Sequence, residues 1–188
     1  MFSRSTQLCH SPTVDQLIDR AQMAFINDGI ILIANTEQHC VEYARTDRNE
    51  FGIYAGQKNG YGLKTIGYRT GINTPSVVGI AYDSSLFAYI GIQHPAEGVI
   101  LELDVPTGSV QPILQTIGVA FKYLHIDWFS EQLYAIAGTD VIKVDILSAD
   151  DATYHNLTGP AMVTLMLPAD FVVLRHNLIL VADQTNHR

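Results

Sequence analysis

Apolar and polar residues alternate in short runs along most of the chain, which is the pattern of half-buried β-strands rather than of helices. Clusters of Gly, Asn, Asp, Ser and Pro separate these runs and predict tight turns between the strands. A helical period is only weakly visible, over residues 14–21. The expected strands cover residues 23–26, 30–34, 40–44, 51–55, 77–82, 86–92, 99–105, 110–115, 123–128, 132–137, 141–146, 171–174 and 178–182.

These strands fall into units that repeat along the chain. Residues 33–39, Ile-Ala-Asn-Thr-Glu-Gln-His, match residues 181–187, Val-Ala-Asp-Gln-Thr-Asn-His, in register. The two segments are separated by about three periods of roughly 49 residues, and weaker copies lie between them at residues 88–94 and 133–140. A period of this length is typical of propellers and repeat arrays. Each unit therefore predicts an antiparallel meander of short strands.

The predicted fold is all-β, a β-propeller of four-stranded antiparallel blades with about three and a half blades in this chain. Pro112 cannot donate a ladder hydrogen bond, so its strand is expected at the outer edge of its blade. The glycine-rich residues 56–73 are expected to form a connecting loop, since no Gly-Lys-Ser/Thr phosphate motif follows them. Residues 1–22 form an N-terminal segment, and the blades are expected at residues 23–56, 77–116, 123–167 and 170–188.

The two matching segments resemble the signature of NHL repeats, a strand ending in Val-Ala-Asp followed by a small turn and Asn-His-Arg. Residues 181–188 carry this signature and residues 33–41 resemble it, whereas the third unit is closer to the low-density-lipoprotein-receptor type of propeller repeat, through residues 126–128 and 133–134. The resemblance implies a fragment of a six-bladed, TolB-like propeller, and a four-bladed ring is the alternative. The signature residues, expected to be structural, are Ala34, Asn35, His39, Ala182, Asp183, Asn186, His187 and Arg188.

Charge and cysteine content limit the kinds of partner and metal site that we expect. The 188 residues contain 11 Lys and Arg against 19 Asp and Glu, a formal net charge of −8, so nucleic acid is not expected as a partner unless a local basic face exists, as RNA recognition by some NHL proteins would require. Neither a secretory signal in the first 22 residues nor an apolar stretch long enough to enter a membrane is visible. The compartment stays open. Cys9 and Cys40 lack the paired spacing of a zinc site, and whether they form a bridge is also open.

Histidines and acids are the candidate chemical groups. His39, His94 and His187 are expected in equivalent turns of successive blades, about 10 Å or more apart. Zinc ligands must lie about 2.0–2.1 Å from one ion, so no metal site is predicted from these three residues. His125 and Asp127 are two apart on one strand and point to the same side. They are the candidates for an axial ligand or an acid/base pair, with a structural pair as the alternative.

We therefore expect a non-catalytic β-propeller scaffold, part of a longer protein, that binds a protein, peptide or other ligand without a cofactor. The alternative is a fragment of a propeller hydrolase or lyase with a metal at the axis, which requires several acids or histidines converging on one ion. The aromatic residues Tyr123, Trp128, Phe129 and Tyr134 are expected to pack between blades or to supply an interaction surface.

Overall fold

The computed structural model describes residues 22–26, 29–57, 62–95, 97–127, 129–146, 153–157, 165, 168–174 and 178–184. These residues form β-strands and connecting turns, without an α-helix among them, and therefore no helix in this part of the chain could cross a membrane. The strands are β1 (Met23–Ile26), β2 (Ile30–Asn35), β3 (Cys40–Arg45), β4 (Glu50–Gly56), β5 (Gly67–Tyr68), β6 (Val77–Tyr82), β7 (Phe87–His94), β8 (Glu97–Asp104), β9 (Ser109–Ile117), β10 (Phe121–Asp127), β11 (Gln132–Ala137), β12 (Asp140–Asp145), β13 (Thr153–Asn156), β14 (Pro168–Leu174) and β15 (Leu178–Asp183).

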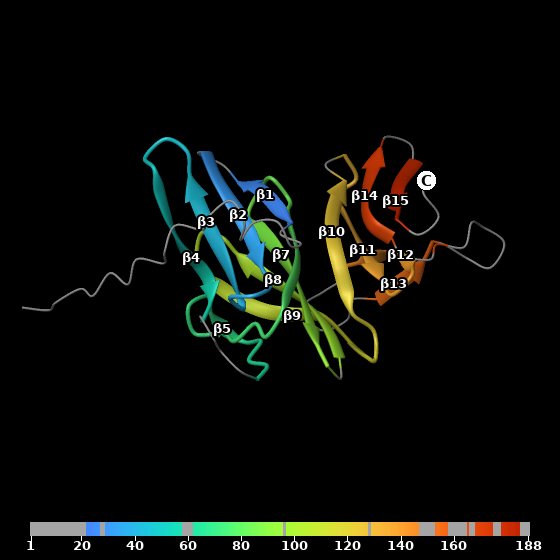
Figure 1. Ribbon diagram of the computed structural model, residues 1–188, viewed down its shortest axis with the longest axis horizontal. Coiled ribbons are helices and arrows are strands. Elements are labelled where there is room, and N and C mark those ends of the chain that lie inside the picture. The colour runs from blue at the N-terminus through green and yellow to red at the C-terminus, as the bar shows by residue number, and fades with distance from the viewer. Residues whose placement is uncertain are drawn as a thin grey trace, which may run out of the picture.

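The strands pair as antiparallel sheets in which strands consecutive in the chain are neighbours, except that β5 lies beside β9 (Figure 1). The first sheet is β1-β2-β3-β4, the second is β5-β9-β8-β7-β6, the third is β10-β11-β12-β13, and β14 pairs with β15 in a two-stranded sheet. The predicted all-β fold built from antiparallel four-stranded sheets is thus confirmed. The weak helical pattern of residues 14–21 lies outside the described residues.

The segment expected to be only a connecting loop contributes to the second sheet. Within residues 56–73, Lys64 forms an isolated bridge with Asn73, and β5 pairs with the first two residues of β9. The prediction that β9 is the outermost strand of its sheet is therefore wrong over its first residues. Because β5 is so short, Pro112 lies beyond its reach, and the missing N–H of this proline disrupts no pairing there.

Three apolar cores fill the spaces between consecutive sheets. Leu32 and Val41 of the first sheet pack with Ile90 of the second, and the remaining cores join the second sheet to the third and the third to the β14–β15 hairpin. Along β11, Leu133 faces the second core and Tyr134 faces the third. Successive side chains of a strand point to opposite faces, so a sheet between two others must be apolar on both. Each fully buried large apolar side chain contributes about 1.5–3 kcal/mol.

The first strands of consecutive sheets lie next to one another: β1 beside β6, β6 beside β10, and β10 beside β14. One side chain links three of them. The Gln22 Oε1 atom accepts hydrogen bonds from the backbone N–H groups of Ile80 (2.9 Å) and Leu124 (3.0 Å), and its Nε2 donates to the Leu124 carbonyl at 2.5 Å. A Cβ on Gly79 would lie 3.0 Å from the backbone nitrogen of Tyr123, so a larger residue here would require β6 and β10 to shift apart by a few tenths of an ångström.

Both ends of this series of sheets leave apolar side chains exposed. On β1, Met23 is 56% and Phe25 67% exposed, whereas their neighbours Ala24 and Ile26 are buried. On the β14–β15 hairpin, the face turned away from the third sheet is apolar as well. Its exposed side chains are Val172, Leu174, Leu178 and Leu180. The two terminal sheets thus have apolar outer faces that the described residues do not cover.

Candidate binding pocket

A pocket of about 510 Å³ lies where the first three sheets meet at one end. Its walls come from the β2–β3 turn, the segment that enters β6, the β7–β8 turn and the first half of β10. A volume of this size is typical of sites for small molecules or short peptide segments. The lining residues are Thr36, His39, Pro75, Ser76, Val78, Gln93, Pro95, Lys122 and Tyr123.

The wall from the first sheet is a hydrogen-bonded turn. The Asn35 Oδ1 atom accepts from the backbone N–H of Gln38 (3.0 Å), which closes the turn locally. The Thr36 hydroxyl donates to the carbonyl of Val77 at 2.6 Å, and the carbonyl of His39 accepts from the hydroxyl of the buried Thr74 at 2.7 Å. The turn is therefore attached at two points to the segment that enters β6, and the walls on the two sides of the pocket are held together.

The wall from the third sheet contains a β-bulge. The pairing register of β10 with β11 shifts between Lys122 and His125, and Tyr123 has a φ of +48°. A bulky side chain rarely adopts this left-handed conformation, which costs about 1–3 kcal/mol. His39, on the opposite wall, also has a positive φ, of +57°. Bulges and strained residues are enriched at functional sites because they redirect side chains, and here both strained residues line the pocket.

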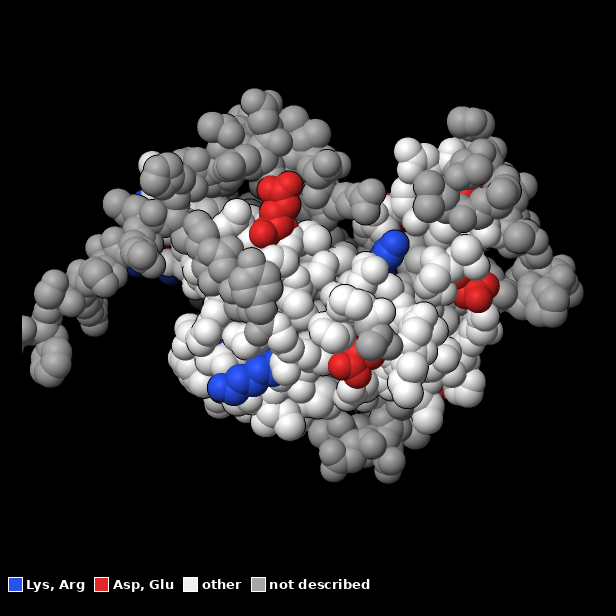
Figure 2. Space-filling view, turned by 60° about the horizontal axis from the view of Figure 1, so that its bottom comes forward, with Lys and Arg blue, Asp and Glu red and all other residues white. Residues whose placement is uncertain are grey.

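The electrostatic character of the pocket differs from that of the whole chain. Lys122 is the only Lys or Arg among the lining residues, which include no Asp or Glu, although the chain carries a net charge of −8. Figure 2 turns the lower end of Figure 1 toward the viewer and shows single, separated acidic and basic side chains among uncharged ones. The described lining of the pocket therefore has one positively charged side chain and no negatively charged one.

The histidines predicted at equivalent turns are only partly visible. His39 lies in the β2–β3 turn and His94 at the end of β7, which are corresponding positions in the first and second sheets. The His94 Nδ1 atom lies 4.0 Å from a carboxylate oxygen of Glu97, next to the pocket residues Gln93 and Pro95. His187 lies outside the described residues. The His39 carbonyl thus contacts Thr74 in the segment that enters the second sheet, whereas His94 lies near Glu97 within its own sheet.

The axial candidates His125 and Asp127 have different surroundings. The His125 ring packs edge-on against Phe171 with 5.9 Å between ring centroids, and it lines a smaller cavity of about 190 Å³ along β1, β6 and β10. Burial lowers the pKa of His125, against the opposing effects of Asp127, Asp170 and a hydrogen bond to the backbone of Val173.

Asp127, in contrast, organises the turn after β10. Its carboxylate accepts from the Ser130 hydroxyl (2.6 Å) and from the backbone N–H of Phe129 (3.1 Å), and these hydrogen bonds lower its pKa. Asp127 does not line the cavity that His125 lines. In the described part of the chain, no group of three or more His, Cys, Asp and Glu side chains could hold a metal ion.

The remaining signature residues that the structure describes have structural contacts and do not line the pocket. Asn35 donates to a carboxylate oxygen of Glu42 at 2.8 Å, and Ala34 is fully buried. Asp183 ends β15 with 2% exposure, next to the exposed Ala182. Residues 186–188, together with Trp128 and Cys9, lie outside the described residues, whereas Cys40 is buried at the start of β3.

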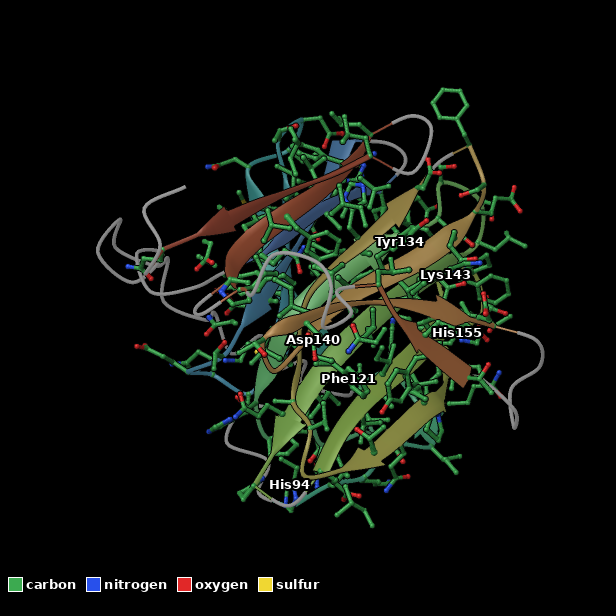
Figure 3. The ribbon with its side chains drawn as sticks, turned by 90° about the vertical axis from the view of Figure 1, so that its right-hand side faces the viewer. His94, Phe121, Tyr134, Asp140, Lys143 and His155 are labelled. Carbon is green, nitrogen blue, oxygen red and sulfur yellow. The ribbon has the colours of Figure 1, made fainter. Side chains whose placement is uncertain are left out.

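A second polar cluster lies on the third sheet. The Asp145 carboxylate is 3.0 Å from the Lys143 Nζ atom and 3.0 Å from the His155 Nε2 atom. Figure 3 shows Lys143 and His155 on the neighbouring strands β12 and β13, in the same row as Tyr134. His155 is 67% exposed, and ion pairs of this kind contribute about 0–1 kcal/mol. We therefore regard the cluster as a surface ion network and not as a site.

Sequence patterns identified part of this pocket and missed the rest. The turn that contains His39 was found through the repeat, and Tyr123 was noted as one of a group of aromatic residues. Thr36 and Gln93 lie in two copies of the repeat, but nothing in the sequence marks either as a pocket residue, and Lys122 carries no motif. A left-handed tyrosine has no sequence signal at all.

Comparison with known proteins finds similar solved structures but no family. A scan against family models finds no match, and neither does a search of curated proteins. Among solved structures, the chain is similar to one described as the "extracellular domain of the putative one component system BT4673 from B. thetaiotaomicron", with 10% identity and a TM-score of 0.49 over 87% of this chain. A second, described as the corresponding domain of a "putative hybrid two component system", gives 12% identity and a TM-score of 0.46 over 86%. The chain spans about a quarter of the length of each, 26% in both cases.

Proposed function

We propose that this chain is a segment of a larger β-propeller, about three and a half blades of a six-bladed, NHL or TolB-like ring, that serves as a non-catalytic scaffold. The pocket between the first three sheets is its binding site, and a protein, peptide or small ligand is its occupant. The observation that carries the proposal is the pocket itself, which turns and strands of three consecutive sheets build together and which contains two strained residues.

The arrangement of the sheets supports the propeller part of this proposal. Apart from β5, which lies beside β9 at the edge of the second sheet, each sheet is a meander in chain order. Each sheet packs on the next, and the edge strands β1, β6, β10 and β14 are neighbours in this order. A series of this kind needs a partner at each end, because a blade buries its faces only against adjoining blades. Exposed apolar patches mark interaction surfaces. The exposed outer faces of β1 and of the β14–β15 hairpin are where further blades would pack.

The contacts of the chemical groups favour a scaffold over an enzyme. Catalysis at an axis needs several acids or histidines around one reacting atom or ion. The Asp127 carboxylate instead accepts hydrogen bonds within its own turn, and the His125 ring packs against Phe171. Pocket residues such as Thr36 and Gln93 can hydrogen-bond a ligand without acting as an acid or a base at neutral pH.

Binding can be tested by recording amide spectra of the ¹⁵N-labelled protein while a library of short peptides is added. We expect the shifts to concentrate at Thr36, Gln93 and Tyr123. Shifts confined to other surfaces would contradict the assignment of the pocket. The enzyme alternative is tested in parallel by calorimetric titration with Ca²⁺ and Zn²⁺, where stoichiometric binding that is lost on replacing His125 or Asp127 would favour it over the scaffold.

A further inference from the structure

The charge of the pocket points to the kind of ligand that it accepts. Lys122 brings one full positive charge to the lining, and no lining residue carries a carboxylate. The whole chain has 19 acidic residues and 11 basic ones, so the sign of the charge in this pocket is opposite to the net charge of the chain. A ligand with a negatively charged group would therefore gain a favourable interaction with the lining of this pocket.

No carboxylate of the described residues neutralises the charge of Lys122. Arg45, Arg48 and Lys143 have carboxylate partners, at 3.2, 3.4 and 3.0 Å, whereas Lys64 and Arg69 have none among the described residues, and among the cations without one Lys122 lines the pocket. No carboxylate of the described residues lies within 4.0 Å of the Lys122 Nζ atom. The side chain is half-buried beside the bulge of β10, so water screens its charge less than that of a fully exposed lysine.

The other lining residues suit the organic part of such a ligand. Thr36, Ser76 and Gln93 offer hydroxyl and amide groups for hydrogen bonds, and Pro75 and Pro95 offer rigid apolar surface. A volume of about 510 Å³ exceeds the needs of a bare inorganic ion and suits a molecule of roughly dipeptide size.

We propose that the pocket binds a small organic carboxylate, with the Lys122 ammonium donating hydrogen bonds to the carboxylate oxygens. This inference rests on the proposed binding function of the same pocket. Peptide C-termini and sugar-derived acids both supply this chemistry, so the experiment includes one probe of each source with a neutral counterpart.

The probes are N-acetyl-alanyl-alanine and its C-terminal amide, and gluconate and the neutral polyol sorbitol. Each is titrated by NMR into the protein at low ionic strength. We expect the acids to bind about tenfold or more tightly than their neutral counterparts, since hydrogen bonds to charged groups are the strong ones. Raising the salt concentration should reduce this preference. The acid that binds more tightly indicates which source the pocket favours.

Three variants assign the preference to one side chain. Lys122→Met should remove it, and Lys122→Arg should retain most of it. Lys64→Met is the matched control, because Lys64 is exposed outside the pocket and its loss changes the net charge equally. The dispersion of the amide spectrum verifies that each variant is folded.

Three results would overturn the inference. If acids and neutral probes shift the pocket amides with equal affinity, the pocket is still a binding site, and only its preference for carboxylates is wrong. If no probe shifts the pocket amides, or if Lys64→Met weakens binding as much as Lys122→Met does, the carboxylate inference fails. The peptide library then decides the proposed function independently.

Discussion

Replacing Gln22 by alanine removes the side chain that joins the first strands of three sheets. Its amide serves three backbone groups: the N–H groups of Ile80 and Leu124 and the carbonyl of Leu124. Ile80 and Leu124 are each 1% exposed, so these groups lose their partners in a buried environment. Each unsatisfied buried group costs about 1–3 kcal/mol. The adjoining cavity of about 190 Å³ can admit water, which recovers part of this cost.

We therefore expect Gln22→Ala to lower the free energy of unfolding by about 2–4 kcal/mol, a large part of the 5–15 kcal/mol typical of a domain. Urea unfolding followed by circular dichroism measures this change, with the denaturant slope unchanged. Gln57→Ala is the matched control, because Gln57 makes one exposed hydrogen bond, of 3.3 Å, to the carbonyl of Thr70. We expect the control to lose less than about 0.5 kcal/mol. Equal losses in the two variants would refute the reasoning.

Three further predictions follow from packing and charge. Gly79→Ala should lower the free energy of unfolding by about 1–3 kcal/mol in the same urea assay, because the added methyl group meets the backbone of Tyr123. An unchanged unfolding midpoint would mean that β6 and β10 can move apart to accommodate the methyl group without cost. Because burial lowers the pKa of His125, protonation favours the unfolded chain, and stability should fall as the pH drops below the ordinary value of 6.5. His125→Leu should reduce this pH dependence in urea unfolding at pH 7 and pH 5, and an identical dependence would contradict the assignment. Because Leu180 is 52% exposed on an uncovered apolar face, we expect the chain to self-associate in sedimentation velocity and Leu180→Asp to weaken this association while changing stability by less than about 0.5 kcal/mol, whereas unfolding of the variant would show that Leu180 is buried.

Hydrophobic patterns predicted the long strands well because each inner sheet is apolar on both faces and its turns carry distinct residues. The strands β1 (Met23–Ile26), β6 (Val77–Tyr82) and β11 (Gln132–Ala137) have the predicted bounds, and the other predicted strands that lie wholly within the described residues differ by one to three residues at an end. The pattern failed where burial was low. All four residues of β13 (Thr153–Asn156) are exposed, so no apolar face marks the strand, and β5 is too short to show a period.

The candidate site was harder to predict because its residues share a position in space and not a pattern in sequence. Lys122 precedes a left-handed residue on β10, and Thr36 follows β2 in a different sheet. Only the packing of the first strands brings them to one pocket. A repeat reveals which turns correspond to one another, as for His39 and His94, and it cannot reveal which of these turns has a cavity beside it.

The hydrogen bonds between the sheets also explain why the strained backbone conformations of Tyr123 and His39 persist. Gln22 holds the backbone N–H of Leu124, directly after the left-handed Tyr123, and so fixes the strand on the far side of the bulge. On the opposite wall, the hydroxyl of Thr74 holds the carbonyl of the left-handed His39. A strained residue persists only where its surroundings over-determine its conformation. Because buried hydrogen bonds hold both walls, the pocket is already formed before a ligand arrives, and binding need not include the cost of ordering these walls.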